Sequence, residues 1–246
     1  MTVIYREKIY RSLPLIYNHL MRKIRYDYWA DYIFRLTSKY ITKNASVLEL
    51  AAGNCRLADY LIKKFPNLIV SDLSYYMLAN SESKIKNKVC CDMLSIPFKK
   101  KFDLIYLTFD SINYLLTRKK VLSFFGQIKE QLNTNGVLVF DASLEKNSIS
   151  HIKEPKRRGS YKSFNYLHKS IYNKKTRIHK NIFEIALQDG KIFKETHKQK
   201  ILDYYEYFDL IERSKLYVVE CFDAFTFDDA KANSKRVQFV VKKFEE

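Results

Sequence analysis

The sequence predicts an α/β fold built on a doubly wound, mostly parallel sheet, and three observations carry that prediction. Short apolar runs alternate with amphipathic segments from about residue 47 to residue 141, which is the rhythm of a parallel sheet with crossover helices. The run Phe102–Thr108 is almost entirely apolar, as expected for a strand buried on both faces. The stretch Val47–Tyr60 (VLELAAGNCRLADY) passes from an apolar run through small residues into an amphipathic segment. That strand–turn–helix layout brings a helix N-terminus against a ligand.

Five strands of the parallel sheet are expected, at residues 47–50, 68–70, 88–91, 102–108 and 137–140. Helices are expected between them, near residues 56–64, 74–83 and 118–132. Ser74 is expected to be the N-cap of the second of these helices. The Asn-Thr-Asn-Gly sequence at 133–136 predicts a turn before the fifth strand.

The pattern changes after Asp141. Residues 145–159 are polar and basic, and we expect a mobile loop there. Three antiparallel β-segments are predicted at 161–172, 177–187 and 191–202, and Asp189-Gly190 is a tight-hairpin signal. A helix at 204–214 and an antiparallel pair at 216–222 and 237–242 complete the chain. We therefore expect one domain, 1–246, in which residues 145–202 form an inserted loop and antiparallel β cap that could also join two subunits.

The N-terminal residues 1–45 are expected to be helical, because aromatic and aliphatic residues recur there at helical spacing. The stripe includes Tyr17, Tyr26 and Trp29. Such residues usually pack on a core. A second interpretation is a lid whose rings close over a cationic ligand.

The net charge of +17 would suit RNA, DNA or an anionic membrane. The simpler explanation is compositional, because Lys, Asn, Ile, Tyr and Phe are abundant while Gly and Pro are scarce. We find no membrane-spanning apolar run and no secretory signal. The four cysteines lack the spacing of a metal site or a disulfide framework. We therefore expect a cytoplasmic protein that binds neither a metal nor a membrane.

Carboxylates stand at three predicted strand ends, as Glu49, Asp72 and Asp92. Parallel strands end at one edge of the sheet, where ligands of such folds bind. Asp72 follows Gly53 by 19 residues, a spacing that suits contact with ribose hydroxyls. Three acids would repel a pyrophosphate but suit S-adenosylmethionine, which carries a sulfonium and an ammonium. One such carboxylate could simply cap a helix, whereas three at these intervals favour S-adenosylmethionine over a dinucleotide.

Four segments resemble class I S-adenosylmethionine-dependent methyltransferases in order and spacing: VLELAAGN, IVSDLSYYML, VCCDMLSIPF and FDLIYLTFDSINYL. The chain is most similar to small single-domain enzymes acting on small molecules, including amino-sugar N-methyltransferases. IYNHLMRKIRYDYWADYI and VVECFDAFTFDDAKANSKRVQFVVKK are similar to that group's first and last portions. The resemblance is weakest over 145–195. It implies a Rossmann-like sheet of order 3-2-1-4-5-7-6 with strand seven antiparallel, S-adenosylmethionine as cofactor and S-adenosylhomocysteine as product.

Carried over by position, the resemblance implies that Glu49 and the Ala51–Cys55 loop, which includes Gly53, face the methionine end of the cofactor. It implies that Asp72 binds the ribose hydroxyls and that Tyr17 closes the lid.

The remaining positions carried over concern the adenine and the reacting end. Leu73 and Met77 would lie near the adenine, and Asp92 with the backbone N–H of Met93 would meet its edge. Phe109 would follow the fourth strand at the reacting end.

Methyl transfer is an in-line displacement, to which an enzyme contributes mainly orientation and a dry site. A hydroxyl acceptor also needs a base. We name Asp110, Tyr114 and Tyr26 as the catalytic candidates, and for Tyr114 a packing role is an equal alternative. The four histidines at 151, 168, 179 and 197 are expected to be surface or strand residues. We expect Arg157, Arg158 and Arg236 to be solvated charges rather than a clamp for an acidic substrate.

The loop departs from the family's glycine pattern, because its three glycine positions hold Ala51, Gly53 and Cys55. A side chain costs about 1–2 kcal/mol where the backbone must be left-handed. We expect the cost of the side chain at Ala51 to be small. We expect the Cys55 side chain to enter the space between the helix and the ligand. Two alternatives to a small-molecule N- or O-methyltransferase therefore stay open. One is an RNA methyltransferase using the basic region 153–180, although the motifs for base amino groups or carbon-5 chemistry are missing. The other is a weak or non-catalytic cofactor binder.

Overall fold

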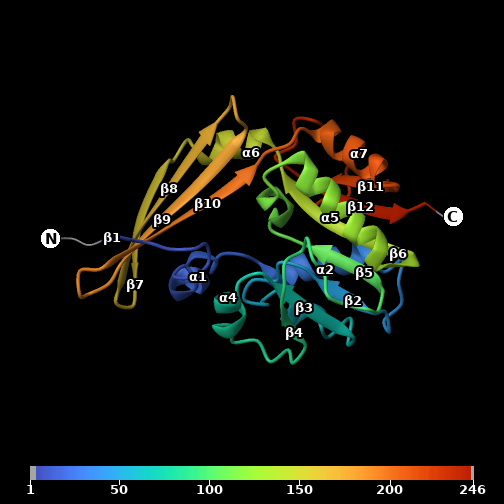
Figure 1. The fold of residues 1–246 in the computed structure, drawn as a ribbon, viewed down its shortest axis with the longest axis horizontal. Helices are drawn as coiled ribbons and strands as arrows, with labels where there is room; N and C mark the ends of the chain where they lie inside the picture. Colours follow the sequence, from blue (N-terminus) through green and yellow to red (C-terminus); the bar gives the residue numbers. More distant parts are fainter. Residues whose placement is uncertain (1–3, 245–246) are drawn as a thin grey trace.

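The computed structural model describes residues 4–244 and contains two sheets that lie side by side along the molecule (Figure 1). The larger sheet has seven strands in the order β11-β12-β6-β5-β2-β3-β4. In chain order its strands are β2 (Val47–Glu49), β3 (Leu68–Asp72), β4 (Lys88–Cys90), β5 (Phe102–Leu107), β6 (Leu132–Ser143), β11 (Leu216–Asp223) and β12 (Arg236–Lys243).

Pairing in the larger sheet is mostly parallel. β2 pairs in parallel with β3 and β5, β3 with β4, and β5 with β6. β12 is antiparallel to both β6 and β11. The predicted mixed, mostly parallel sheet is confirmed, and its short central strands end together at one edge.

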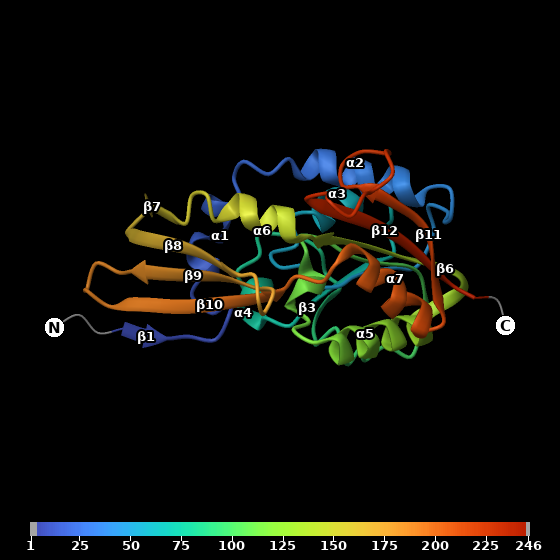
Figure 2. The same ribbon diagram turned by 90° about the horizontal axis from the view of Figure 1, so that it is seen from above.

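Helices cover both faces of this sheet (Figure 2). α5 (Arg118–Gln131) and α7 (Tyr204–Arg213) bury their apolar residues against one face. α2 (Tyr26–Thr37) and α3 (Ala58–Leu61) bury theirs against the other. Both faces of the central strands are therefore packed, which explains why most of their residues are apolar.

Strand β6 differs from the prediction at its start. It begins at Leu132, so residues 133–136 belong to the strand rather than to a turn. Leu132 pairs with Phe102, and the register shifts before Leu104 pairs with Val137. A Cβ on Gly136 would lie 2.8 Å from the Phe102 carbonyl oxygen, so the glycine permits this irregular pairing.

Residues 145–159, expected to be a loop, are largely regular. They form helix α6 (Glu145–His151) and the start of strand β7 (Lys156–Tyr161). The buried His179 ring explains the position of α6, because its Nδ1 lies 2.9 Å from the Ser148 hydroxyl. A tertiary contact of this kind is not visible in local sequence.

The smaller sheet has five strands in the order β1-β10-β9-β8-β7. Its other members are β1 (Ile4–Arg6), β8 (Phe164–Asn173), β9 (Ile178–Ala186) and β10 (Ile192–Lys200). Residues 4–6 were expected to be helical, and this was wrong: they extend β10 in parallel. Residues 1–3 of the same predicted segment lie outside the described residues.

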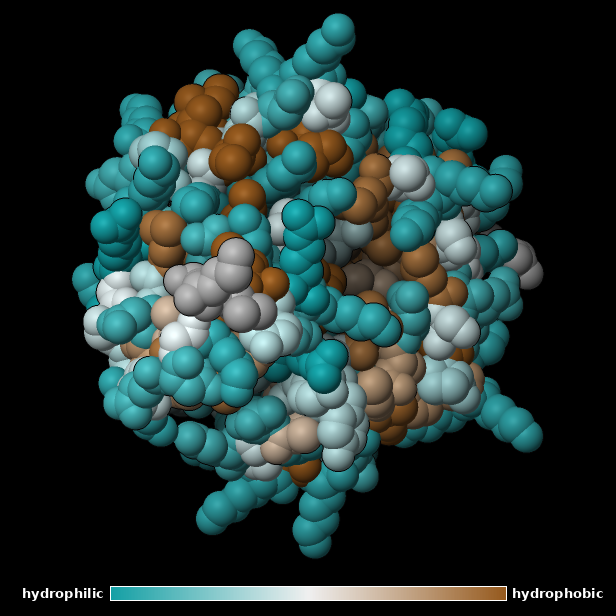
Figure 3. All heavy atoms as spheres, turned by 60° about the vertical axis from the view of Figure 1, so that its left-hand side comes forward, coloured by the Kyte–Doolittle hydropathy of each residue, from teal (hydrophilic) through white to brown (hydrophobic). Residues whose placement is uncertain are grey.

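Helix α1 (Pro14–Leu20) packs on one face of the smaller sheet, where Leu13 and Ile16 contact Ile185 and several aromatic rings. Seen from the side of this sheet, the surface is mostly hydrophilic with hydrophobic patches set into it (Figure 3). Within residues 4–244, no helix is long and apolar enough to cross a membrane.

Candidate active site

A cavity of about 1380 Å³ lies at the carboxyl ends of the central strands and continues beneath the smaller sheet. Every candidate residue named from the sequence lines it: Tyr17, Tyr26, Glu49, Ala51, Gly53, Asp72, Leu73, Met77, Asp92, Met93, Phe109, Asp110 and Tyr114. Side chains of β8, β9 and β10 line the other half. The cavity thus joins the strand-end loops to a second wall that the sequence did not place there.

Two of the three strand-end carboxylates are buried. Glu49 is 2% exposed, and burial raises its pKa to about 8 despite the hydrogen bond that the Tyr106 hydroxyl donates at 2.9 Å. Burial also raises the pKa of Asp72, and this is partly offset because its carboxylate accepts hydrogen bonds from the backbone N–H groups of Ser74 and Gly53. Asp92 is exposed at the cavity rim. This half of the cavity therefore offers acceptors to a cationic ligand.

The loop after β2 uses three left-handed residues. Ala51, Gly53 and Cys55 have φ angles of 53°, 56° and 63°. Ala51 is thus under the same backbone strain as Cys55, which corrects the expectation that it would be mild. The Cys55 side chain is fully buried in the cluster formed with α2 and α3, and Cys55 does not line the cavity. The expectation that it enters the ligand seam was wrong.

The turn after β3 is held by Ser74. Its hydroxyl accepts a hydrogen bond from the Met77 N–H and donates one to the Tyr10 carbonyl, at 3.2 and 2.9 Å. The predicted N-cap of α4 (Tyr75–Ala79) is confirmed. A Cβ added to Gly53 would lie 3.2 Å from Met77 Cε. The loop after β2 therefore packs directly on the segment after β3.

At the end of β5, Phe109 and Asp110 are also left-handed, with φ angles of 58° and 49°. The Asp110 carboxylate accepts hydrogen bonds from Arg236 at 2.9 Å, Gln199 at 2.8 Å and Ser143 at 3.1 Å. These contacts occupy both of its oxygens, so Asp110 is an ion-paired group rather than a free base.

Arg236 is not the solvated charge expected from the sequence. Its side chain is 21% exposed and pairs with both Asp110 and Asp141, the latter fully buried. Burial raises the pKa of Asp141 to about 6, against the opposing effect of Arg236. By bonding both carboxylates, Arg236 on β12 holds the end of β5 and the end of β6 together.

The N-terminal aromatic residues do pack on the core, and they also reach the cavity. The ring centroids of Tyr26 and Phe109 lie 5.6 Å apart. The Arg56 guanidinium lies over the Tyr26 ring, 4.7 Å from its centroid. Burial raises the pKa of Tyr26 to about 12. Trp29 meets the Phe109 ring edge-on at 3.7 Å. Tyr26 therefore both packs on the core and lines the cavity, whereas Trp29 packs on the core without lining the cavity.

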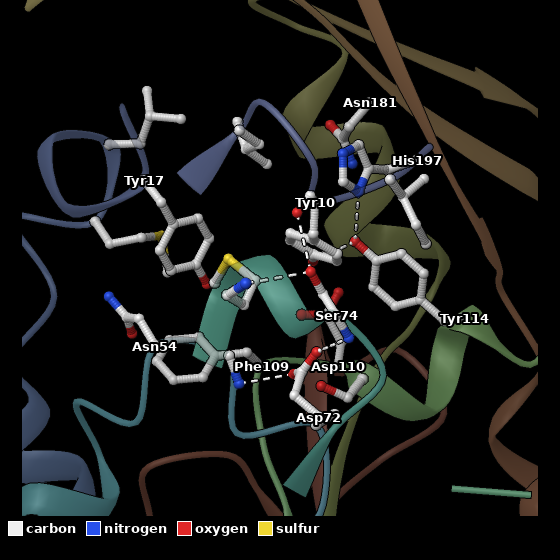
Figure 4. A pocket seen from close by; sticks show the side chains of 18 of the residues that line it. Tyr10, Tyr17, Asn54, Asp72, Ser74, Phe109, Asp110, Tyr114, Asn181 and His197 are labelled. Atoms are coloured by element: carbon white, nitrogen blue, oxygen red, sulfur yellow. Dashed lines mark hydrogen bonds between the residues drawn. The ribbon is translucent and has the colours of Figure 1, made fainter. Parts of the chain in front are cut away.

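Sequence reasoning missed a polar cluster on the second wall (Figure 4). Tyr10 and His197 line the cavity beside Tyr114, and Glu195 lies fully buried behind them. The signal was present, since Glu195, His197 and Gln199 alternate along β10 and therefore share one face. That face could not be assigned without knowing what covers it.

Comparison with known proteins identifies the class. Residues 47–136 match a family model described as a methyltransferase domain. The putative methyltransferase YqeM of Bacillus subtilis is 24% identical over 96% of this chain and 97% of its own length. A putative methyltransferase of Geobacillus sp., GWCH70_2453, is 26% identical over 95% of this chain and 99% of its own. This chain is a methyltransferase.

Solved structures show the same fold. A S-adenosylmethionine-dependent methyltransferase from Clostridium acetobutylicum superposes with a TM-score of 0.79 at 22% identity, covering 95% of this chain and 98% of that chain. The sugar N-methyltransferase KedS8 from Streptoalloteichus superposes with a TM-score of 0.76 at 16% identity, covering 99% and 98%. The methyltransferase has the Rossmann-like class I fold that its motifs indicate. Among residues 4–244 of the methyltransferase, no group of three or more His, Cys, Asp or Glu residues could hold a metal ion.

Proposed function

We propose that this methyltransferase transfers the methyl group of S-adenosylmethionine to a nitrogen or oxygen of a small molecule. The observation that carries the proposal is the cavity itself. It joins the buried carboxylates Glu49 and Asp72 to a wall of tyrosine and histidine side chains from a separate sheet. One half suits the cofactor, and the other suits an acceptor held beside it.

The cofactor half favours a cation over a phosphate. Within residues 4–244, the side chains of Glu49 and Asp72 are hydrogen-bonded to a tyrosine hydroxyl and to backbone N–H groups rather than to lysine or arginine. The ribose would meet Asp72, and the ammonium would meet Glu49. The solved neighbour CalS10, an amino pentose methyltransferase, is described as bound to S-adenosylmethionine, and its TM-score of 0.70 supports the same placement here.

The cavity volume also supports two ligands. At about 1380 Å³ it exceeds the range of about 300–1,000 Å³ typical for one small molecule. The acceptor would lie beneath the smaller sheet, near Tyr114 and Tyr10, and the methyl group would point toward it. In-line displacement then requires orientation and exclusion of water, which the roof formed by β8–β10 and α1 would provide.

We favour an amino sugar as the acceptor. KedS8, described as a sugar N-methyltransferase, and CalS10 share the fold over nearly the whole chain, including the smaller sheet. The weak-binder alternative rested on Cys55, whose side chain lies outside the cavity. The alternative is methylation of RNA bound by the basic region 153–180. The acceptor assay must therefore distinguish an amino sugar from RNA.

The test has two steps. Calorimetry with S-adenosylhomocysteine should give saturable binding. Transfer of a labelled methyl group from S-adenosylmethionine should then be measured with free amino sugars, nucleotide-linked amino sugars and bulk RNA as acceptors. Label in an amino sugar supports the proposal. Label in RNA alone, or an absence of S-adenosylhomocysteine binding, would contradict it.

A further inference from the structure

A buried glutamate organises the acceptor half of the cavity. Glu195 on β10 is fully buried and accepts hydrogen bonds from the backbone N–H groups of Tyr10, Ser12 and Leu13, at 2.5–2.8 Å. The Ser12 hydroxyl adds a fourth at 2.6 Å. Burial alone would raise the pKa of Glu195, but these bonds and His197 lower it to about 2. Glu195 is therefore a carboxylate that can only accept hydrogen bonds.

The state of His197 follows from that of Glu195. The His197 ring is 1% exposed, and its Nε2 lies 3.0 Å from a Glu195 oxygen. Because the carboxylate accepts, Nε2 must carry a proton. In the neutral ring Nδ1 is then the acceptor, and it lies 3.2 Å from the Tyr114 hydroxyl. With the ring in this neutral form, Tyr114 donates to His197.

The chain of contacts continues into the cavity. The Tyr114 and Tyr10 hydroxyls lie 2.7 Å apart, and both residues line the cavity (Figure 4). Burial raises the pKa of each hydroxyl above its usual value. Each hydroxyl therefore stays neutral, so it can pass a proton on but does not act as a preformed phenolate.

We infer that Tyr10, Tyr114, His197 and Glu195 form a proton relay that deprotonates the acceptor. This inference rests on the proposed function and deepens it. As the methyl carbon bonds to the acceptor's nitrogen or oxygen, the carbon–sulfur bond breaks and its electron pair stays on sulfur. Where the acceptor contacts Tyr114, its proton passes to the Tyr114 oxygen as the Tyr114 proton passes to His197 Nδ1. Where it contacts Tyr10, its proton passes to the Tyr10 oxygen, the Tyr10 proton passes to the Tyr114 oxygen, and the Tyr114 proton passes to His197 Nδ1. The resulting imidazolium is paired with the Glu195 carboxylate. The relay thus fits acceptors that carry a hydroxyl or a protonated amine.

Two further observations support a role beyond packing. Tyr10 has a left-handed φ of 58°, and it is held there by Glu195 at its N–H and by Ser74 at its carbonyl. Strain of this kind persists where surrounding contacts over-determine the backbone, often at functional sites. Ser74 also caps the helix after Asp72, so the relay is fixed directly to the cofactor half.

The relay offers a base at this end of the cavity, whereas the Asp110 carboxylate is already hydrogen-bonded to Arg236, Gln199 and Ser143. The titratable groups facing the His197 ring come from three other places: Tyr114 on η1 (Ser111–Tyr114), Tyr10 before α1, and His168 on β8. Glu195 is the anionic partner bonded to the ring.

The first experiment needs no acceptor. Nitrogen-detected NMR of histidine-labelled full-length protein, with and without S-adenosylhomocysteine, reports the protonation of each ring nitrogen. In the relay, His197 should carry its proton on Nε2, with Nδ1 unprotonated. A proton on Nδ1 would overturn the relay, because Nδ1 could not accept.

The second experiment uses an amino sugar that the acceptor assay identifies. His197→Gln keeps a polar group that can accept from Tyr114 but cannot take up a proton, and Tyr114→Phe breaks the chain. Each should lower kcat by about 10²–10⁴-fold, with unchanged affinity for S-adenosylhomocysteine. The pH profile of kcat/KM should differ between wild type and His197→Gln, because only the imidazole of the wild type can take up a proton at this position.

Tyr172→Phe is the matched control. The Tyr172 hydroxyl lies on the same sheet and donates to Glu145 at 2.9 Å, but the residue does not line the cavity. It should retain the wild-type kcat and pH profile. Wild-type kinetics in both relay variants, or an unchanged pH profile in His197→Gln, would show that the cluster only anchors the N-terminal segment. If no amino sugar is methylated, the proposed acceptor class fails, while the NMR result still decides the relay.

Discussion

The Asp72 carboxylate accepts a hydrogen bond from the backbone N–H of Gly53 at 2.8 Å. One side chain thereby ties the loop after β2 to the turn after β3, since its other oxygen accepts from the Ser74 N–H at 2.7 Å. The acid that the sequence assigned to ribose binding therefore also fixes the loop that would carry the methionine end of the cofactor.

Asp72→Ala should weaken S-adenosylhomocysteine binding by about 10–100-fold, because it removes a ribose acceptor and leaves the Gly53 N–H unpaired, a cost of about 1–3 kcal/mol. Calorimetry measures the affinity. Asp103→Ala is the control, since Asp103 bridges Ser46 and Asn133 away from the cavity. It should lower stability but leave the affinity unchanged. Equal losses of affinity in both variants would count against a specific role for Asp72.

Gly53→Ala should destabilise the protein by about 1–2 kcal/mol, because φ is 56° and the new Cβ would lie 3.2 Å from Met77 Cε. It should also weaken S-adenosylhomocysteine binding. Gly126→Ala on α5 is the opposite case, because a Cβ there meets nothing within 4 Å. It should stabilise the helix by about 0.5–1 kcal/mol. Chemical denaturation of both variants checks the pair, and a stabilised Gly53→Ala would refute the strained loop.

Arg236→Ala should cost about 3–5 kcal/mol of unfolding free energy, because it leaves the fully buried Asp141 without its cation. Arg25→Ala removes an exposed pair with Asp27 and should leave the unfolding free energy nearly unchanged. Urea titrations measure both. If Arg236→Ala and Arg25→Ala lowered the unfolding free energy equally, the Asp110–Arg236–Asp141 group would be as exposed to solvent as a surface ion pair.

The cofactor half could be predicted because its signals are local. Ser74, Asp72 and Gly53 fall within two strand–turn–helix segments, where spacing alone determines which end of the sheet they reach. The strain at Ala51 was harder to predict, because its φ of 53° depends on the Ala52 N–H bonding the Ser71 carbonyl on the neighbouring strand.

The acceptor half depends on contacts between distant parts of the chain. The Tyr10 N–H donates to Glu195, which lies 185 residues away in the sequence. The Tyr114 hydroxyl contacts His197, which lies 83 residues away. Alternation along β10 groups Glu195 with His197, but only the tertiary structure shows that residues 10–13 cover them. The same limit explains why Arg236 was taken for a solvated charge.

Glu49 should make the stability of the ligand-free protein fall as pH rises. Its folded pKa of about 8 lies above the ordinary value of about 4.3. A group with a raised folded pKa contributes stability that is fully present below the unfolded pKa and is lost as pH rises through the folded one. Relative to Glu49→Gln, wild type should therefore lose stability steadily between about pH 5 and pH 8. Denaturation at several pH values measures the difference, and Glu130→Gln on the exposed side of α5 serves as control.

Ligand binding should reverse this behaviour, because the ammonium of S-adenosylhomocysteine would favour the Glu49 carboxylate. Calorimetry at about pH 7 in buffers of different ionisation enthalpy should then detect release of most of one proton on binding, and Glu49→Gln should abolish that release. A proton release that persists in Glu49→Gln would mean that another group meets the ammonium. A stability difference that stays constant from about pH 5 to pH 8 would mean that Glu49 is already ionised in the empty cavity.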